Sequence, residues 1–289
     1  MRDTLHIETK RTKIIATLGP SITKDLFSFD DLKEPKKKET VKHAYEKMRE
    51  IILNGVTCVR LNLSHGTHEE HAVRIKIARE VAKSLNRNIA IMLDTKGPEI
   101  RIHKCEGDKV VIKENDLVDI YTRKKVLGNR HEFSCSDSSG KYNMANDVKK
   151  GSLILVDDGK LQLFVDEVMP ELGLIKAVAL NSHFIKENKR INLPGSEYSI
   201  PFLSAKDILD IDFACKQGCD YIAASFTNSA QNVNDIRAEL KKHNKLSIQI
   251  IAKIETGNGI NKIDEIFEAA DGVMVARGDL GLEIPYYDV

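Results

Sequence analysis

The sequence has almost no net charge, no paired cysteine spacing and no long apolar run. Its 44 lysine and arginine residues balance 43 aspartate and glutamate residues, so no overall field favours nucleic acid or an anionic membrane. Any affinity for phosphate must come from a local arrangement. No apolar run approaches bilayer length, and the start of the chain, MRDTLHIETKRTK, lacks the apolar region of a signal peptide. We therefore predict a soluble, cytoplasmic protein.

The cysteine pattern argues against a disulfide framework. There are five cysteines, an odd number, and none of them are spaced as CxxC. Cys215 and Cys219 lie four residues apart, as one face of a helix would place them. We predict buried core residues at these positions in preference to a metal or redox site.

Two common nucleotide-binding signatures are also missing. No GxGxxG follows the first apolar run, and no GxxxxGK[ST] occurs anywhere, so neither a Rossmann nor a P-loop site is indicated. At 289 residues the chain is long enough for one large domain or two ordinary ones.

The chain does contain six short apolar runs, each bounded by polar or turn residues. They occupy residues 13–20, 57–66, 89–98, 221–226, 248–255 and 272–279. Nearly continuous apolar composition predicts strands that are covered on both faces. Helical patterns lie between most of the runs, which predicts a parallel sheet, either doubly wound or closed as a (β/α)8 barrel. Polar residues cluster where the runs end, and this favours the barrel.

The helical patterns have recognisable starts and apolar stripes. The predicted capping boxes are Thr67 with Glu70 and Ser204 with Asp207, and the predicted stripes are Ile208, Ile211 and Cys215, then Val233, Ile236 and Leu240. Both features support helices after the second run and on either side of the fourth.

Two segments interrupt the alternation. Thr23 to Lys42 has eleven charged residues in twenty and predicts a solvated insertion or an irregular helix start, because acids interspersed among the bases disfavour a nucleic-acid tail. From residue 100 to 193, short strand-like runs alternate with Gly, Asn and Asp clusters, which predicts an inserted all-β domain. The predicted domains are therefore residues 1–99 and 194–289 of one barrel, with residues 100–193 as the insertion.

The chain supplies only six strand–helix units, whereas a closed barrel of this type needs eight. The first and sixth strands would be unpaired edges. We therefore expect a truncated chain with little activity of its own.

Six motifs together resemble pyruvate kinase: TKIIATLGPS, VRLNLSHG, IMLDTKGPEIR, INLPG, IIAKIET and MVARGDLGLEIP. The resemblance covers Thr12 to Val289. It implies a (β/α)8 barrel with an inserted β lid, and transfer of a phosphoryl group from phosphoenolpyruvate to ADP, giving pyruvate and ATP, the last step of glycolysis. It also implies Mg²⁺ or Mn²⁺ together with K⁺, and a homotetramer for the full-length protein.

Oxygen-bearing side chains near the second and third runs form the first candidate site. Asn62, Ser64, Asp94 and Thr95 offer hard oxygen atoms that suit a monovalent cation, and the resemblance implies that they bind K⁺. It further implies that Arg60 contacts the transferring phosphate and that Asn62 also borders the nucleotide. Glu99 follows the pattern of potassium-dependent members.

The second candidate site lies in Ile250 to Leu282. Strand side chains alternate, so Lys253 and Glu255 would share a face if the strand continues through them. The resemblance implies that Lys253 stabilises the phosphoryl group in flight and that Glu255 and Asp279 bind Mg²⁺. Backbone N–H groups at Gly278 and Asp279 would hold the substrate carboxylate.

The resemblance assigns the nucleotide phosphates to Arg101 and Lys189. For a guanidinium group such as Arg101, paired phosphate oxygens are a suitable partner. The alternative to a binding site, for all of these charged residues together, is a surface salt-bridge cluster. His65, His68 and His71 cannot share one helix face, and we predict surface histidines in preference to a metal site.

Some features depart from the family pattern. The charged segment after Ser21 is long, the segment before Ser204 reads SEYSIPF, and Thr227 and Asn228 stand where an arginine is common. An active-site threonine, the allosteric site and the proton donor to the enolate are not assigned. Two rival hypotheses stay open here: a metal-dependent aldolase or lyase that acts on pyruvate-like enolates, and an inactive fragment of the kinase.

Overall fold

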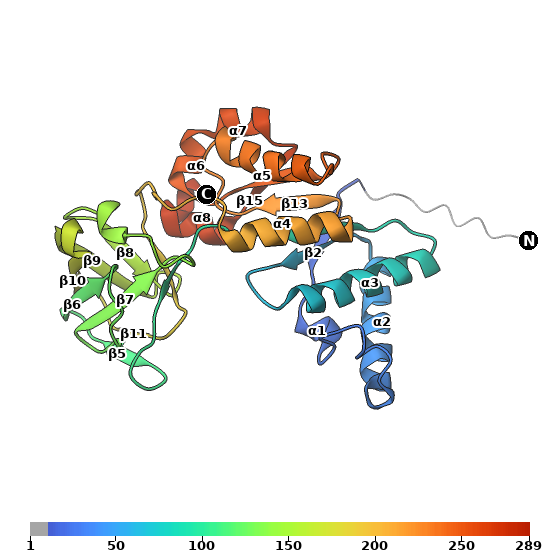
Figure 1. Ribbon diagram of the computed structural model, residues 1–289, viewed down its shortest axis with the longest axis horizontal. Coiled ribbons are helices and arrows are strands. Elements are labelled where there is room, and N and C mark those ends of the chain that lie inside the picture. Colours follow the sequence, from blue (N-terminus) through green and yellow to red (C-terminus); the bar gives the residue numbers. More distant parts are fainter. Residues whose placement is uncertain (1–10) are drawn as a thin grey trace, which may run out of the picture. The chain divides into compact units, whose positions relative to one another are not determined.

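The computed structural model describes residues 11–289, and the chain divides into two compact units (Figure 1). One unit contains the chain up to Thr95 together with Asp210–Ala223 and Leu240–Gln249. The other contains Lys96–Leu209, Ala224–Glu239 and Ile250–Val289. The chain therefore passes between the units several times.

Parallel strands form the centre of the first unit. They lie in the order β1 (Ile14–Thr17), β2 (Val56–Asn62), β3 (Ala90–Asp94) and β13 (Tyr221–Ala224). The pairing of β2 with β3 places Asn62 beside Asp94, and Ala223 of β13 pairs with Asp94 from the other side. Since all these strands are parallel, their carboxyl ends meet at one edge.

Helices cover this sheet. They are α1 (Pro20–Thr23), the 3-10 turn η1 (Pro35–Lys37), α2 (Lys38–Leu53), α3 (His68–Ser84) and the end of α4 (Ala205–Gln217). In α2, the buried residues Ala44, Met48 and Ile52 recur every fourth position and form the core-facing stripe. The capping box of Thr67 and Glu70 at the start of α3 is confirmed.

The charged segment 23–42 forms an irregular helix start, one of the two alternatives that the sequence suggested. Turns and η1 precede α2, which begins at Lys38. Lys37 Nζ lies 2.6 Å from Asp31 Oδ1, and Leu26 is fully buried beneath the charged surface. The segment is therefore an irregular helix start that one apolar side chain anchors to the core.

The second unit contains a closed β barrel. Its strand order is β10-β6-β7-β4-β12-β8-β9, with β4 (Ile100–Ile102), β6 (Leu117–Tyr121), β7 (Glu132–Ser136), β8 (Leu153–Val156), β9 (Leu161–Met169), β10 (Leu174–Ala179) and β12 (Arg190–Asn192). A side ribbon pairs β5 (Val110–Ile112) with β11 (His183–Ile185). The short turns η2 (Met144–Asn146) and η3 (Pro170–Leu172) connect strands. Phe133 lies fully buried inside this barrel.

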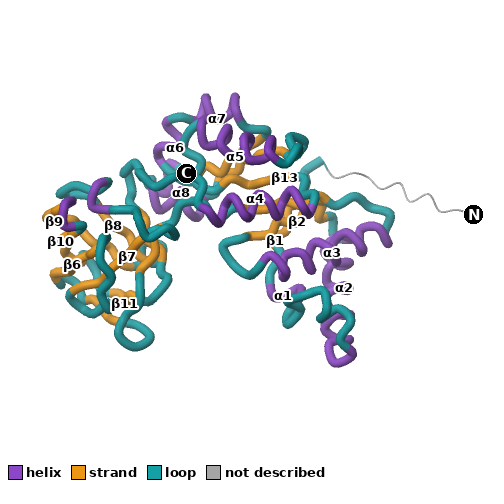
Figure 2. The backbone as a smooth tube through the Cα atoms, in the orientation of Figure 1, coloured by secondary structure: helices purple, strands orange, loops and turns teal. Residues whose placement is uncertain are grey.

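The rest of the second unit is α/β. It comprises most of α5 (Ala230–Lys242), β14 (Gln249–Ile254), α6 (Gly257–Asn261), α7 (Ile263–Ala269), β15 (Gly272–Val275), α8 (Arg277–Glu283) and η4 (Tyr286–Asp288). Strand β14 pairs with β15 in parallel. Figure 2 shows strands and loops through the inserted barrel and helices between the parallel strands. The predicted α/β fold with an inserted β structure is confirmed.

All six apolar runs form strands, but two of them are not covered on both faces as predicted. Ile15 in β1 is 47% exposed and Val275 in β15 is 57% exposed. Within residues 11–289, β1 pairs only with β2 and β15 only with β14. An edge strand with a single neighbour leaves apolar side chains uncovered, and this accounts for the difference.

One helical stripe is confirmed and the other is wrong at one position. Val233, Ile236 and Leu240 of α5 are fully buried. In α4, however, Ile208 is 41% exposed, because Asp207 and Ile211 take the buried face. No helix in the described part of the chain is long and apolar enough to cross a membrane.

Candidate active site

The first cluster lies at the carboxyl ends of β2 and β3. Arg60 Nε donates to Asp94 Oδ2 at 2.6 Å, and its Nη1 donates to Thr17 Oγ1 at 3.1 Å. Asp94 is only 1% exposed, whereas the Arg60 side chain is 26% exposed. A buried carboxylate therefore anchors a guanidinium group that still reaches solvent.

The oxygen atoms proposed to bind K⁺ lie beside this ion pair. Asn62 Oδ1 accepts the backbone N–H of Ser64 at 2.9 Å, which fixes the turn after β2. Thr95 is 3% exposed, and its Oγ1 lies 3.4 Å from the carbonyl of Ala223. The structure therefore brings Asn62, Ser64, Asp94 and Thr95 to the same sheet edge, as parallel pairing requires.

The second cluster follows β14. Lys253 Nζ lies 2.9 Å from Glu255 Oε1 and donates to Ser225 Oγ at 2.8 Å. Lys253 is 7% exposed and Glu255 is 1% exposed. The two side chains share a face, as strand alternation predicts.

The electrostatics of Glu255 are those of a buried acid beside a cation. Burial raises the pKa of Glu255, and the neighbouring Lys253 opposes that rise. Oε2 accepts the backbone N–H of Phe226 at 2.6 Å. The other oxygen, Oε1, lies 2.9 Å from Lys253 Nζ and forms an ion pair with that ammonium group.

The backbone of Phe226 is unusual, and sequence analysis did not predict it. Phe226 has φ of 55°, a left-handed conformation that is rare for a bulky side chain. This conformation turns its N–H toward Glu255. Strain of this kind concentrates at functional sites. Neither Phe226 nor Ser225 has a sequence signal beyond its position at the end of an apolar run.

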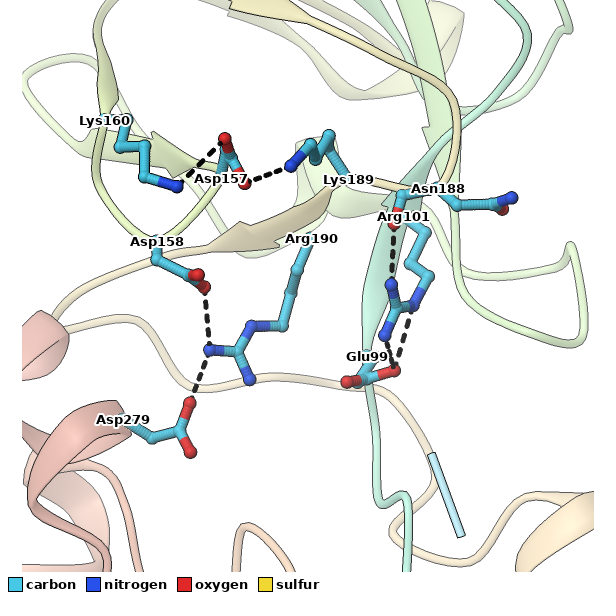
Figure 3. A network of polar contacts seen from close by, with 9 residues as sticks. All are labelled: Glu99, Arg101, Asp157, Asp158, Lys160, Asn188, Lys189, Arg190 and Asp279. Atoms are coloured by element: carbon cyan, nitrogen blue, oxygen red, sulfur yellow. Dashed lines mark hydrogen bonds and ion pairs between the residues drawn. The ribbon is translucent and has the colours of Figure 1, made fainter. Parts of the chain in front are cut away.

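Asp279, the third residue of α8, is paired with an arginine of the inserted barrel (Figure 3). Arg190 on β12 donates from Nη2 to Asp279 Oδ1, and the same nitrogen lies 3.2 Å from Asp158 Oδ1. The guanidinium carbon lies 5.9 Å from the centre of the Phe226 ring. The sequence analysis did not single out Arg190.

The candidate nucleotide-binding residues Lys189 and Arg101 are both held by carboxylates (Figure 3). Lys189 Nζ donates to Asp157 Oδ1 at 2.6 Å. Burial acts to raise the pKa of Asp157, but hydrogen bonds from Lys189, His183 and Lys160 lower it to about 2. Arg101 donates from Nε and Nη2 to Glu99 Oε2 at 3.0 and 2.8 Å, and from Nη1 to the carbonyl of Asn188 at 2.6 Å.

Arg101 also faces a cavity. The cavity has a volume of about 750 Å³. Its charged lining residues are the basic Lys96, Arg101, Lys104 and Lys125 and the acidic Glu99, Asp137 and Glu187. The wall of the cavity is therefore of mixed charge, with one positive charge in excess. Lys189 does not line this cavity.

The prediction of surface histidines is wrong for His71. His71 is 2% exposed, and its Nε2 lies 2.8 Å from the carbonyl of His65. That contact closes the turn before α3, so the ring has a structural role inside the fold. His68 stacks on Phe213 with ring centroids 4.4 Å apart.

The prediction that Cys215 and Cys219 are buried is confirmed. Cys215 and Cys219 are each 5% exposed, and all five cysteines are free. Burial raises the pKa of Cys219 to about 12. A thiol with such a pKa is a poor ligand or nucleophile at neutral pH.

Comparison with known proteins identifies the family of this chain. The family model described as "Pyruvate kinase, barrel domain" matches residues 9–289. The chain belongs to the pyruvate kinase family. It is 52% identical to the pyruvate kinases of Mycoplasma genitalium and Mycoplasma pneumoniae over 280 residues, which is 97% of this chain and 55% of each relative. It is 41% identical to the pyruvate kinase of Geobacillus stearothermophilus, covering 97% of this chain and 43% of that protein.

Membership in the pyruvate kinase family does not favour the aldolase alternative. The chain spans about half the length of the curated relatives it matches. The parallel-strand units and the inserted barrel therefore represent part of a pyruvate kinase architecture.

The acidic side chains of the site are too few to form a metal site from protein ligands alone. Within residues 11–289 there is no cluster of three or more His, Cys, Asp and Glu that could hold a metal ion. Mg²⁺ sites need fewer protein ligands, because Mg²⁺ keeps several waters and takes substrate oxygens. The charge of Asp279 raises the pKa of Glu255, so the two carboxylates are close enough to interact. Two neighbouring carboxylates are hard oxygen donors of the kind that a divalent cation such as Mg²⁺ takes.

Proposed function

We propose that the whole protein catalyses the pyruvate kinase reaction. A phosphoryl group leaves phosphoenolpyruvate and forms a P–O bond with the terminal phosphate of ADP, which gives ATP. The electron pair of the broken P–O bond stays on the enolate oxygen, and protonation at carbon then yields pyruvate. The observation that carries the proposal is the buried Lys253 held 2.9 Å from Glu255, because a family match alone does not show an intact reaction centre.

Lys253 is proposed to stabilise the phosphoryl group during transfer. Phosphoryl transfer depends on positioning and on charge neutralisation, with little covalent work for the protein. Ser225 and Glu255 hold the ammonium group in place, so little reorganisation is needed when charge develops. The resemblance assigns a second phosphate contact to Arg60, whose guanidinium group Asp94 anchors.

Glu255 and Asp279 are proposed to hold Mg²⁺ or Mn²⁺. When bound, the cation neutralises charge on the phosphate and carboxylate oxygens of the substrate. The protein keeps both carboxylates ionised and oriented. For Glu255, the backbone N–H of Phe226 does so by donating a hydrogen bond to Oε2. Backbone N–H groups at Gly278 and Asp279 are proposed to hold the substrate carboxylate.

Asn62, Ser64, Asp94 and Thr95 are proposed to bind K⁺. A carboxylate, an amide, hydroxyls and nearby carbonyls suit a weakly hydrated monovalent cation. Asp94 shares its charge with Arg60, so this site links the cation to a phosphate-contacting residue. We further propose that Glu99 marks a potassium-dependent enzyme, as the family pattern suggests.

The inserted barrel is proposed to act as a lid over the nucleotide. Arg101, Lys189 and Asn62 are assigned to the nucleotide, and the cavity beside Arg101, which four basic side chains help to line, offers room for it. A closed lid excludes water and so protects the phosphoryl group from hydrolysis. A cytoplasmic location and a homotetramer are proposed from the resemblance alone.

The test is a pyruvate-formation assay on the complete protein. With Mg²⁺, K⁺ and ADP, phosphoenolpyruvate should give pyruvate and ATP in equal amounts, and without ADP it should give none. Lys253→Met should abolish turnover and still bind Mn²⁺. Lys262→Met, a change of the same kind at an exposed position, should leave turnover intact. Consumption of phosphoenolpyruvate without ADP, or normal turnover by Lys253→Met, would refute the proposal.

A further inference from the structure

Arg190 connects the inserted barrel to the helix that carries the proposed metal ligand Asp279. It belongs to β12 of the inserted barrel, yet its guanidinium group pairs with Asp279 in α8 (Figure 3). The Arg190 side chain is 19% exposed and that of Asp279 is 29% exposed. The pair is thus largely shielded from solvent, where an ion pair is screened less than at an open surface.

Arg190 has a second carboxylate within reach. Asp158 Oδ1 lies 3.2 Å from Nη2, and the Asp158 side chain is 59% exposed. Asp158 sits in the turn between β8 and β9 with φ of 57°. Arg190 can therefore lose one carboxylate and keep the other without leaving its place beside Phe226.

The same turn contacts α8 through apolar atoms. A methyl group at Gly159 would lie 3.5 Å from Leu282 Cδ2, so the backbone of the turn already lies close to that side chain. The ion pair and this contact together fasten the tip of the inserted barrel to α8.

We propose that Arg190 is a built-in competitor of the divalent cation at Asp279. The inference rests on the proposed role of Asp279 as a metal ligand. A guanidinium group on Asp279 Oδ1 occupies one of the two oxygens that a cation could use, and its positive charge repels a dication. When the cation binds, Arg190 gives up Asp279 and keeps Asp158.

A positioning role for Arg190 would have the opposite consequence. If Arg190 merely oriented Asp279 for the metal, its removal would weaken metal binding. If it competes, its removal strengthens metal binding. The sign of the change in affinity separates the two roles without any measurement of turnover.

The experiment is a Mn²⁺ titration of the complete protein, with free Mn²⁺ measured by electron paramagnetic resonance. Arg190→Gln should bind Mn²⁺ about fivefold more tightly than the wild type, which is the scale of one partly exposed ion pair. Arg190→Lys keeps the charge but loses the planar fork, so its affinity should lie between the two. Unchanged or weaker binding by both variants would overturn the proposal.

Two further variants make the result specific. Lys160→Gln removes a positive charge from the same turn, but Lys160 pairs with Asp157 at 3.3 Å, so Mn²⁺ affinity should stay unchanged. Asp279→Asn should lose Mn²⁺ binding. If Asp279→Asn binds Mn²⁺ like the wild type, the metal assignment itself has failed and the inference fails with it. If only the Arg190 variants give the wrong sign, the proposed function survives and the inference does not.

Discussion

The carboxylate of Asp207 connects the start of α4 to the loop that follows β3. Its Oδ1 accepts the backbone N–H of Gly97 at 3.1 Å, and its Oδ2 accepts the N–H of Ser204 at 2.9 Å. The N–H of Asp207 in turn donates to Ser204 Oγ at 3.1 Å. Asp207 is fully buried. One residue therefore completes a predicted capping box and also holds a long-range contact that the sequence did not suggest.

Asp207→Ala should destabilise the fold more than an ordinary capping mutation does. It removes the cap and leaves the buried N–H of Gly97 without its acceptor, and we expect a loss of about 2–3 kcal/mol in the free energy of unfolding. Urea unfolding measures this loss. Asp212→Ala on the same helix breaks a pair with Lys216 and should cost less than about 1 kcal/mol. Equal losses would show that the contact to Gly97 contributes nothing.

Gly97→Ala should damage the site through Phe226. Gly97 has φ of 69°, and a Cβ there would lie 3.0 Å from Ser225 Cβ and 3.1 Å from Phe226 Cδ2. Both residues contact the Lys253 and Glu255 pair, so a shift should lower pyruvate formation by about tenfold or more. Gly107→Ala is a matched control, with a positive φ of 57° and no atom within 4 Å of the added Cβ. If both variants lose activity alike, backbone strain and not packing is the cause.

The parts of the fold that the sequence predicts are those that local patterns determine. Six apolar runs predicted six strands, and Thr67 with Glu70 predicted a helix start, because strand alternation and capping operate over a few residues. Lys253 and Glu255 share a face for the same reason. His71 was misjudged because a polar side chain on the buried face of α3 finds its partner in the carbonyl of His65, which no periodicity reveals.

The contacts that local patterns miss are long-range. Arg190 and Asp279 are 89 residues apart in the chain, and nothing near either residue predicts that they pair. The left-handed backbone of Phe226 is equally hidden, because left-handed positions are expected at Gly or Asn. It follows from the buried acceptor Glu255, which lies 29 residues away. Tertiary contacts decide both features.

Turnover should depend on K⁺, and Ser64 should help to set the K⁺ requirement. Replacing K⁺ by tetramethylammonium should remove most activity. The methyl groups of this bulky cation prevent oxygen ligands in a compact site from reaching its charged centre. Ser64→Ala should raise the K⁺ concentration for half-maximal activity by about tenfold. Ser84→Ala removes a hydroxyl that donates to the carbonyl of Val81 within α3, and it should leave this K⁺ concentration unchanged. Full activity in tetramethylammonium would refute the proposed K⁺ site.

The last prediction concerns Glu283 at the end of α8. Burial raises the pKa of Glu283 to about 7, against the opposing effect of hydrogen bonding with Asn192 and of the Arg190 charge. Glu283 Oε1 and Asn192 Oδ1 are both buried without a hydrogen-bond partner among the described residues. A protonated Glu283 fits this surrounding better than a carboxylate does, because a buried charge costs more than a buried neutral acid.

The raised pKa has a defined consequence for stability. Because the folded protein binds this proton more tightly than the unfolded chain, the contribution of Glu283 is complete below about pH 4.5 and is lost as the pH rises to about 7. Glu283→Gln mimics the protonated form and should escape this loss. Between pH 5 and 8, the free energy of unfolding of the variant should gain about 3 kcal/mol on that of the wild type. Urea unfolding at both pH values measures the difference, and parallel pH profiles for the two proteins would show that Glu283 is ionised throughout.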